Sequence, residues 1–151
     1  MPLPRLIIEP GRAIVGRSGV ALYTVGAIKE VPGVRTYVAV DGGMADNIRP
    51  ALYDARYEAV LATRMHEEAV GPVTIAGRYC ESGDILVWDI LLPHVLAGDL
   101  VAVPVSGAYC LAMSSNYNLA QRPAVVLVRD GEGHLWRRRE TLEDLLRYDQ
   151  V

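Results

Sequence analysis

The pair of residues in this sequence best suited to transfer a proton is Cys80-Glu81, within the run RYCESGD at residues 78–84. The run lies between two apolar segments, so the thiol and the carboxylate are expected in a turn between strands. A carboxylate beside a thiol disfavours a second negative charge, so Cys80 would stay protonated and able to donate a proton. The alternative, which composition alone favours, is a buried structural cysteine followed by a turn glutamate.

A second candidate site is the run Glu9-Pro10-Gly11-Arg12, which follows an expected strand at residues 5–8. Ligands gather at the carboxyl ends of strands in α/β folds. Gly11 would let the backbone approach a phosphate closely, and the Arg12 guanidinium can clamp an anion with two parallel hydrogen bonds. Glu9 cannot bind phosphate, but its carboxylate can accept a hydrogen bond from a protonated ring nitrogen. The alternative is an ordinary turn at a strand end with a surface ion pair.

Three further residues have side chains suited to holding a small ligand. Arg49 and Tyr53 are four positions apart, so they share one face if this stretch is helical, and the pair could hold a carboxylate. Tyr109 follows the flexible run SGA, which could direct its phenol at a pocket. The competing interpretations are a solvated arginine stacked on a tyrosine, and a half-buried core tyrosine with a satisfied hydroxyl.

Composition and motifs argue against several classes of function. The 151-residue chain carries a formal net charge of −3, and its basic run at 137–139 is offset by nearby acids, so nucleic acid is not an expected partner. The histidines lack metal-ligand spacing, so no metal site is expected; they are His66, His94 and His134. No apolar run is long enough to span a bilayer, no secretory signal is visible, and the two cysteines lack a CxxC spacing. These features predict a reduced, cytoplasmic protein with no membrane partner.

The sequence predicts a mainly β chain with an α/β beginning. Residues 5–8 are expected to form a strand, and residues 18–30 a helix that Ser18 caps and Pro32-Gly33 ends. A last helix over residues 141–148 is expected to begin with a capping box of Thr141 and Asp144. Between them, short β-branched runs separated by turns predict strands over residues 36–40, 58–62, 73–76, 85–91, 100–105 and 124–129.

This pattern predicts two parts. Residues 34–151 are expected to form an antiparallel β-barrel or sandwich domain with a short C-terminal helix. A single strand–helix unit cannot bury both faces of its strand. Residues 1–33 are therefore expected to be the last unit of an α/β barrel whose other units are missing, with the boundary near Pro32-Gly33.

Taken in order, these clusters make the chain resemble the C-terminal part of the diaminopimelate decarboxylase family. The resemblance runs from about residue 6 to residue 148, and its most specific blocks are CESGD at 80–84 and MSSNYN at 113–118. Those enzymes are pyridoxal-phosphate decarboxylases built from an alanine-racemase-type barrel followed by a β-domain. Their relatives that decarboxylate ornithine or arginine typically have Asp where Glu81 stands.

The resemblance implies a role for each candidate residue. Cys80 would be the catalytic proton donor, and Glu81 would recognise the distal amino group of the substrate. The residues implied to bind the cofactor, pyridoxal 5'-phosphate, are Glu9 at the pyridine nitrogen, and Gly11, Arg12 and Tyr109 near the phosphate. The residues implied to bind the substrate, diaminopimelate, besides Glu81 are Arg12, Arg49, Tyr53 and Tyr109. The family also implies a homodimer in which Cys80 and Glu81 act across the interface.

Lysine is the residue type that limits what this chain can do alone. The family attaches its cofactor covalently to a lysine of the barrel, whereas the single lysine here, Lys29, matches no cofactor position. The resemblance therefore implies that the chain supplies the proton donor and the specificity contacts of an enzyme that converts meso-diaminopimelate to L-lysine and CO2, and that it is inactive by itself. Two alternatives stay open: a stand-alone dimerisation or regulatory module, and a small-ligand-binding β-domain without catalysis.

Overall fold

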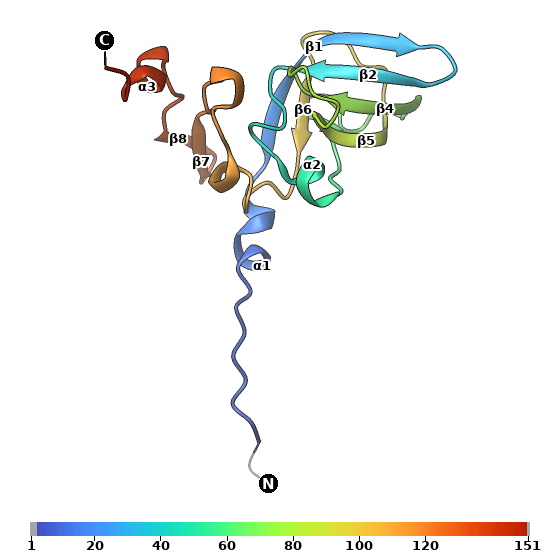
Figure 1. Ribbon diagram of the computed structural model, residues 1–151. Coiled ribbons are helices and arrows are strands. Elements are labelled where there is room, and N and C mark those ends of the chain that lie inside the picture. The colour runs from blue at the N-terminus through green and yellow to red at the C-terminus, as the bar shows by residue number, and fades with distance from the viewer. Residues whose placement is uncertain (1–2, 151) are drawn as a thin grey trace.

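The computed structural model describes residues 3–150, and its strands form one six-stranded sheet and a separate two-stranded hairpin (Figure 1). The strands are β1 (Ala21–Val31), β2 (Arg35–Val40), β3 (Val60–Leu61), β4 (Gly71–Ala76), β5 (Ile85–Leu92), β6 (Leu100–Val103), β7 (Val125–Arg129) and β8 (Glu132–Arg137). The helices are α1 (Arg12–Val15), η1 (Gly16–Ser18), α2 (Arg49–Tyr53), η2 (Leu111–Met113), η3 (Tyr117–Leu119) and α3 (Leu142–Leu146). None of the helices in this described range has the length and apolar character needed to cross a bilayer.

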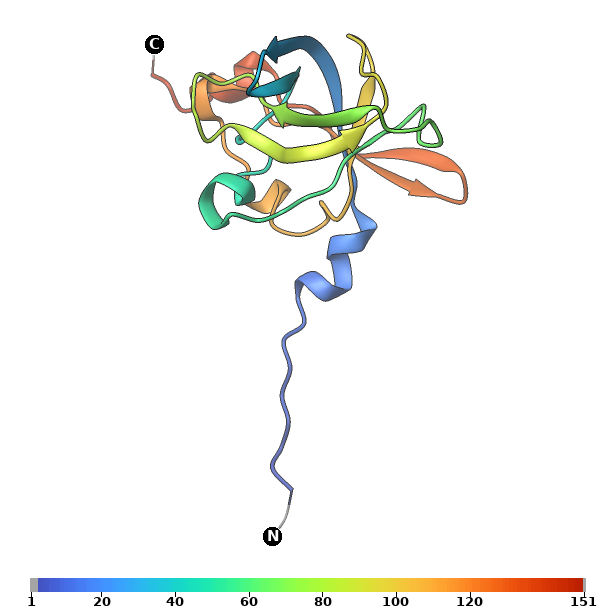
Figure 2. The ribbon, with the colours of Figure 1, turned by 90° about the vertical axis from the view of Figure 1, so that its right-hand side faces the viewer.

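The six-stranded sheet has the order β3-β6-β1-β2-β4-β5 and curls into a barrel-like shape (Figure 2). The N-terminal half of β1 pairs with β6, and its C-terminal half pairs with β2. Every strand pair in the described residues is antiparallel except β2 with β4, which is parallel and is joined by a long connection through α2 and β3. The predicted mainly β fold is confirmed, and the six predicted strands of the β-domain correspond to β2 through β7.

Aliphatic residues from several strands make the core. Val38, Ile75 and Val101 are fully buried, and each comes from a different strand. Burying such a side chain stabilises the fold by roughly 1.5–3 kcal/mol relative to leaving it exposed. Tyr23 and Val25 reach the same core from β1, two positions apart, which is the spacing of one face of a strand. The sheet is thus wrapped around a single apolar interior.

The helix predicted over residues 18–30 is wrong, because most of this stretch forms β1. A helix would place the apolar residues of this stretch on one buried face, but Val25 is buried, whereas Leu22 and Ile28 are exposed. Tyr23 and Val25 are buried at strand spacing instead. The tertiary reason is that β2 and β6 offer backbone hydrogen-bond partners along β1, and such pairing overrides a weak local helix preference.

The first described residues do not form the strand predicted at residues 5–8. Residues 3–10 run as an extended, exposed segment that projects from the sheet, and they pair with no strand within residues 3–150 (Figures 1 and 2). Because β1 belongs to the sheet, the N-terminal part that stands apart from it is residues 3–20. That this segment is the end of a missing barrel stays a prediction.

The C-terminal region contains the predicted capping box and a strand that was not predicted. The Thr141 hydroxyl accepts the backbone N–H of Asp144 at 3.4 Å, and the Asp144 carboxylate accepts the backbone N–H of Thr141 at 2.7 Å. The unpredicted strand is β8, which pairs with β7 across the turn at Asp130-Gly131. This hairpin and α3 lie to one side of the six-stranded sheet (Figure 1).

Candidate functional site

Arg12 opens α1, and its guanidinium lies over the ring of Tyr57, 5.8 Å from the ring centroid. A desolvated cation–π contact of this kind is worth about 0.5–2 kcal/mol. The Nη1 atom of Arg12 is buried, yet it has no hydrogen-bond partner among the described residues. Leaving a buried guanidinium nitrogen unpaired is costly, so this atom is a donor that suits an anionic group.

Arg49 repeats this arrangement at the start of α2. Its guanidinium contacts two rings, those of Tyr53 and Tyr109, and each centroid is 5.4 Å away. Its Nε atom is also buried with no hydrogen-bond partner in the described part of the chain. Tyr53 reaches Arg49 because positions four apart on a helix share a face. The surface therefore presents a second unsatisfied cationic donor beside tyrosine rings.

Tyr109 links Arg49 to Gly11, the residue that precedes Arg12. Its ring contacts Arg49, and its hydroxyl lies 3.4 Å from the place that a β-carbon on Gly11 would occupy. Gly11 has a φ of +38°, so a side chain there would be strained, although its β-carbon would touch the phenol only at an ordinary van der Waals distance. Tyr109 itself has a φ of +63°, a strained conformation of the kind that gathers at ligand-binding sites. We call this group the arginine–tyrosine cluster; it comprises Gly11, Arg12, Arg49, Tyr53, Tyr57 and Tyr109.

A tight backbone junction holds α1 and η1 against the loop that carries Tyr109. The Gly107 N–H donates to the Gly16 carbonyl at 3.0 Å, and the Ser106 N–H donates to the Gly19 carbonyl at 2.8 Å. A β-carbon on Gly107 would overlap the carbonyl oxygen of Val15, so only glycine fits there. Because both sides of the junction are backbone, they cannot move aside as a flexible side chain would. The junction thereby fixes the position of α1 relative to Tyr109.

Cys80 and Glu81 lie in an exposed loop between β4 and β5, as predicted. Asp84 closes the loop, and its carboxylate accepts backbone hydrogen bonds from Met44 at 2.6 Å and from Tyr79 at 2.7 Å. Burial raises the pKa of Asp84 above its ordinary value, and the two backbone donors oppose that rise. The interpretation of Cys80 as a buried structural cysteine is wrong, because its side chain is exposed.

The loop with Cys80 and Glu81 is not joined to the arginine–tyrosine cluster within this chain. It packs on α2 through Gly83, which lies against Ala51. Positions two apart on a helix point about 200° apart, so Ala51 faces away from the side on which Arg49 contacts Tyr109. No hydrogen bond or ion pair between described residues links the loop to the cluster.

Glu9 also stays apart from the cluster. It is exposed in the extended segment, two residues before Gly11. Within residues 3–150, it forms no hydrogen bond or ion pair with the cluster. The candidate residues that the structure brings together are therefore those of the arginine–tyrosine cluster, whereas Glu9, Cys80 and Glu81 lie elsewhere.

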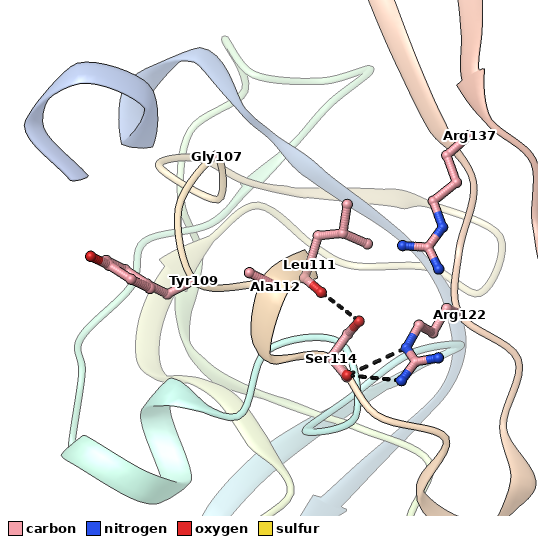
Figure 3. Close-up of a pocket in the computed structure, with 7 residues that line it drawn as sticks. All are labelled: Gly107, Tyr109, Leu111, Ala112, Ser114, Arg122 and Arg137. Atoms are coloured by element: carbon pink, nitrogen blue, oxygen red, sulfur yellow. Dashed lines mark hydrogen bonds between the residues drawn. The ribbon is translucent and has the colours of Figure 1, made fainter. Parts of the chain in front are cut away.

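The loop that carries Tyr109 also borders a surface hollow (Figure 3). Tyr109 points to one side of the loop, while Arg122 and Arg137 lie on the opposite side. The Nε and Nη2 atoms of Arg122 each donate to the Ser114 carbonyl at 3.3 Å, and its Nη1 donates to Glu140 at 2.9 Å. Because Arg122 is engaged within the protein, its role here is to brace the loop around Ser114.

Two residues around the candidate site have no signal in the sequence that marks them. Tyr57 supports Arg12, and its hydroxyl lies 3.7 Å from the Sγ atom of Cys110, which is buried in the core. Tyr117 donates its hydroxyl hydrogen bond to Oε1 of Glu81 at 2.5 Å. It belongs to the run MSSNYN, which is one of the two most specific blocks of the resemblance, but no pattern in the sequence pairs Tyr117 with Glu81.

The structure thus defines a barrel-like β-domain with a cationic, tyrosine-lined site and, apart from it, an exposed thiol–carboxylate pair. Residues 14–107 match the family described as the C-terminal sheet domain of pyridoxal-dependent decarboxylases. The chain belongs to this family, as its resemblance implied.

The chain is similar to several diaminopimelate decarboxylases. The one from Bacillus subtilis is 60% identical over 147 residues, which are 97% of this chain and 34% of that relative. The one from Synechocystis is 52% identical over 149 residues, which are 99% of this chain and 32% of that relative. The crystal structure of the M. jannaschii diaminopimelate decarboxylase in complex with L-lysine has a TM-score of 0.88 at 40% identity, and the match covers 99% of this chain and 34% of that one. The chain therefore spans about a third of the length of these relatives.

A weaker likeness links the chain to a decarboxylase with a different printed substrate. The lysine/ornithine decarboxylase of Vibrio vulnificus has a TM-score of 0.64 at 28% identity, and the match covers 74% of this chain and 30% of that one. The likeness to the diaminopimelate enzymes is greater in identity, in coverage and in backbone geometry. A dimerisation module or a non-catalytic ligand-binding domain is not favoured, because relatives that match nearly the whole chain are decarboxylases.

The arginine–tyrosine cluster fits the phosphate of a pyridoxal cofactor. Arg12 keeps a buried nitrogen without a partner among the described residues, the Tyr109 hydroxyl lies beside the preceding residue, Gly11, and Gly11 has no side chain to block an oxyanion. Arg49 keeps a second unpaired nitrogen that suits a carboxylate. Lys29, the one lysine in the sequence, is exposed on β1 and is not part of the arginine–tyrosine cluster, so the cluster itself has no lysine for covalent attachment of such a cofactor.

Proposed function

We propose that this chain is the C-terminal third of a pyridoxal-phosphate-dependent decarboxylase that converts meso-diaminopimelate to L-lysine and CO2. The observation that carries the proposal is the pair of guanidinium groups, Arg12 and Arg49, which each keep a buried nitrogen without a partner on one tyrosine-lined surface. The class of cofactor is inferred from the family. The substrate is inferred from relatives at 50–60% identity that are named diaminopimelate decarboxylase.

The first task of the chain is to hold anionic groups. Arg12 and the Tyr109 hydroxyl donate hydrogen bonds to the cofactor phosphate, and Gly11 lets the phosphate approach the backbone. Arg49, braced by Tyr53, binds a carboxylate of the substrate, which Arg12 and Tyr109 also approach. Glu9 accepts a hydrogen bond from the pyridine nitrogen. The bound cofactor supplies an electron sink for the electron pair left behind when CO2 departs.

The second task is proton transfer and substrate recognition. The exposed thiol of Cys80 donates a proton to the carbon that has lost CO2, and the Glu81 carboxylate accepts a hydrogen bond from the distal ammonium of the substrate. Cys80 and Glu81 lie away from the arginine–tyrosine cluster of the same chain. A homodimer resolves this separation, because the loop of one subunit then completes the site of the other.

The remaining parts of the site lie outside this chain. A barrel domain supplies the lysine that holds the cofactor, and residues 3–20 belong to the end of that barrel. Residues 3–10 carry exposed apolar side chains, among them Leu6, Ile7 and Ile8. Apolar surface of this kind is rarely left uncovered, which supports their assignment to a neighbouring domain.

The test joins this chain to a barrel that contains the lysine. A chimera would carry the barrel of the B. subtilis relative, with this chain in place of its C-terminal third. The chimera is expected to release CO2 from meso-diaminopimelate, whereas this chain alone is not. Cys80→Ala is expected to lower kcat at least about 100-fold, the usual contribution of a general acid. Lys29→Arg is the matched control and is expected to leave turnover unchanged.

Two results would contradict the proposal. The first is a chimera that folds and binds pyridoxal phosphate but releases no CO2 from meso-diaminopimelate. The second is turnover by the 151-residue chain without any other protein. Size-exclusion chromatography and cofactor absorbance separate a misfolded chimera from a folded, inactive one.

A further inference from the structure

Glu81 is held by a residue from a loop far away in the sequence. The Tyr117 hydroxyl donates to Oε1 of Glu81 at 2.5 Å. The Glu81 residue is otherwise exposed, and an exposed glutamate samples several rotamers. A carboxylate offers about four acceptor positions, so the bond from Tyr117 fixes one oxygen and leaves Oε2 free for another donor.

Tyr117 is itself fixed from two sides. Its ring meets the ring of Tyr79 edge-on, with centroids 5.4 Å apart and an interplanar angle of 79°. The backbone after it turns through Asn118 and Leu119, which have φ values of +53° and +55°. Residues with side chains adopt this conformation only when the surrounding structure requires it, so the turn is a defined one.

The loop around Tyr117 is anchored to the C-terminal region. The Asn116 side-chain amide donates to Glu140 at 2.6 Å and to the Ala120 carbonyl at 2.9 Å. Arg122 donates to Glu140 from both its backbone and its guanidinium, at 2.9 Å each. On the opposite side, the Ser115 N–H donates to the Ala45 carbonyl at 2.9 Å. These bonds clamp the segment at both ends and leave the Tyr117 phenol aimed at Glu81.

The direction of the hydrogen bond is fixed by chemistry. An ionised carboxylate can only accept, so the phenol must donate. The hydrogen bond to Glu81 raises the pKa of Tyr117 above its ordinary value of 10.0, so the phenol stays protonated throughout the neutral range. A protonated phenol on one oxygen keeps the carboxylate pointed in a single direction.

We propose that Tyr117 is a positioning residue: it orients Glu81 so that the free oxygen of the carboxylate meets the distal ammonium of the substrate. The proposal rests on the proposed function, because Tyr117 acts only through Glu81. A preoriented carboxylate favours substrates with a cationic group at that place and raises their affinity, because less freedom is lost on binding. Within residues 3–150, the Tyr117 hydroxyl forms a hydrogen bond to Glu81 and none to Cys80 or to the arginine–tyrosine cluster, so its removal should act on substrate binding more than on the proton-transfer step.

The test is a double-mutant cycle in the chimera with meso-diaminopimelate as substrate. Tyr117→Phe removes the hydroxyl but keeps the ring that packs on Tyr79. The expected result is a rise in KM of about tenfold, within the range of a lost charge-assisted hydrogen bond, with kcat changed less than about threefold. In a Glu81→Gln background, Tyr117→Phe should raise KM no further. Tyr148→Phe, which removes an exposed hydroxyl, is the matched control and should change neither constant.

The outcomes distinguish this proposal from the proposed function. If Glu81→Gln leaves KM unchanged, the role proposed for Glu81 fails. If Glu81→Gln raises KM but Tyr117→Phe does not, the positioning role alone fails. If Tyr117→Phe lowers kcat in both backgrounds and lowers the unfolding temperature, Tyr117 is merely structural, and the proposal is overturned.

A second measurement needs no turnover. In the 151-residue chain labelled with ¹³Cζ-tyrosine, the Tyr117 resonance is expected to titrate above pH 10.0, and Glu81→Gln should move its titration to lower pH. An unchanged Tyr117 titration in the Glu81→Gln variant would show that the two side chains are not paired in solution, and it would overturn the proposal independently of any activity.

Discussion

The guanidinium of Arg12 lies over the ring of Tyr57, 5.8 Å from its centroid. This contact couples the candidate anion site to the core, because Tyr57 is buried and its hydroxyl lies 3.7 Å from the Sγ atom of Cys110. The orientation of Arg12 is therefore set by the packed interior of the β-domain and not by solvent. Replacing the Tyr57 ring should therefore weaken anion binding by Arg12, even though Tyr57 itself is not expected to contact the ligand.

The first prediction tests this coupling. In the chimera, Tyr57→Leu is expected to weaken pyridoxal phosphate binding about three- to tenfold, because the guanidinium of Arg12 loses its cation–π support. Fluorescence titration of the cofactor into the apoprotein measures the change. Tyr57→Phe keeps the ring and should retain most of the affinity. An equal loss in both variants would mean that the hydroxyl, and not the ring, is what matters.

The second prediction concerns the backbone junction at Gly107. A methyl group there would overlap the carbonyl of Val15, so Gly107→Ala is expected to lower the free energy of unfolding by about 1–3 kcal/mol, the usual cost of overpacking. Urea denaturation of the chain measures this change. Gly71→Ala is the matched control, since no atom lies within 4 Å of the added methyl group and its stability should not fall. Equal midpoints for the two variants would contradict the close approach.

The third prediction is a pH dependence that arises from Glu140. The backbone N–H of Arg122, with the side chains of Asn116 and Arg122, lowers the pKa of Glu140 from 4.5 to about 2. Between these values the unfolded chain binds more protons at this position than the folded one, so folding stability rises with pH. The stabilisation from Glu140 is therefore complete above pH 4.5 and is lost as pH falls toward about 2.

The measurement is the thermal unfolding midpoint of the wild type and of Glu140→Gln from pH 6 downward. The wild type is expected to be the more stable at pH 6, and the difference should shrink as pH falls below 4.5. Glu30→Gln, at an exposed position on β1, serves as the control for a general charge effect. A difference between wild type and Glu140→Gln that stays constant down to pH 2 would show that Glu140 does not titrate as its contacts require.

The strands of the β-domain could be predicted because their signals are local. β-branched runs bounded by glycine and proline mark β2, β4 and β5, and the capping box marks the start of α3. β1 could not be predicted in the same way. Its apolar residues fit a helix about as well as a strand, and pairing with β2 and β6, which only the folded chain supplies, decides between the two.

The residues of the candidate site likewise fall into two groups: those that local sequence signals select and those that only tertiary contacts reveal. Arginines and tyrosines at suggestive spacings could be selected from the sequence, and the structure joins Arg12, Arg49 and Tyr109 into one cluster. The residues that support them could not be selected, because their role is a tertiary contact. Tyr57 meets Arg12, and Tyr117 meets Glu81, across separations in sequence that no motif connects.

The last prediction distinguishes the two thiols. Cys80 is exposed in the loop between β4 and β5, whereas Cys110 is buried in the core beside Tyr57. A thiol-specific disulfide reagent is therefore expected to modify one thiol per folded chain rapidly and the second only after the core opens in denaturant. Cys80→Ser should abolish the rapid phase and leave the slow one, whereas Cys110→Ser should abolish the slow phase and leave the rapid one.

Rapid modification of both thiols in the folded protein would mean that the barrel opens around Cys110 under native conditions. Protection of both would mean that the loop with Cys80 is covered, which is the outcome expected only when a second subunit or a barrel domain is bound.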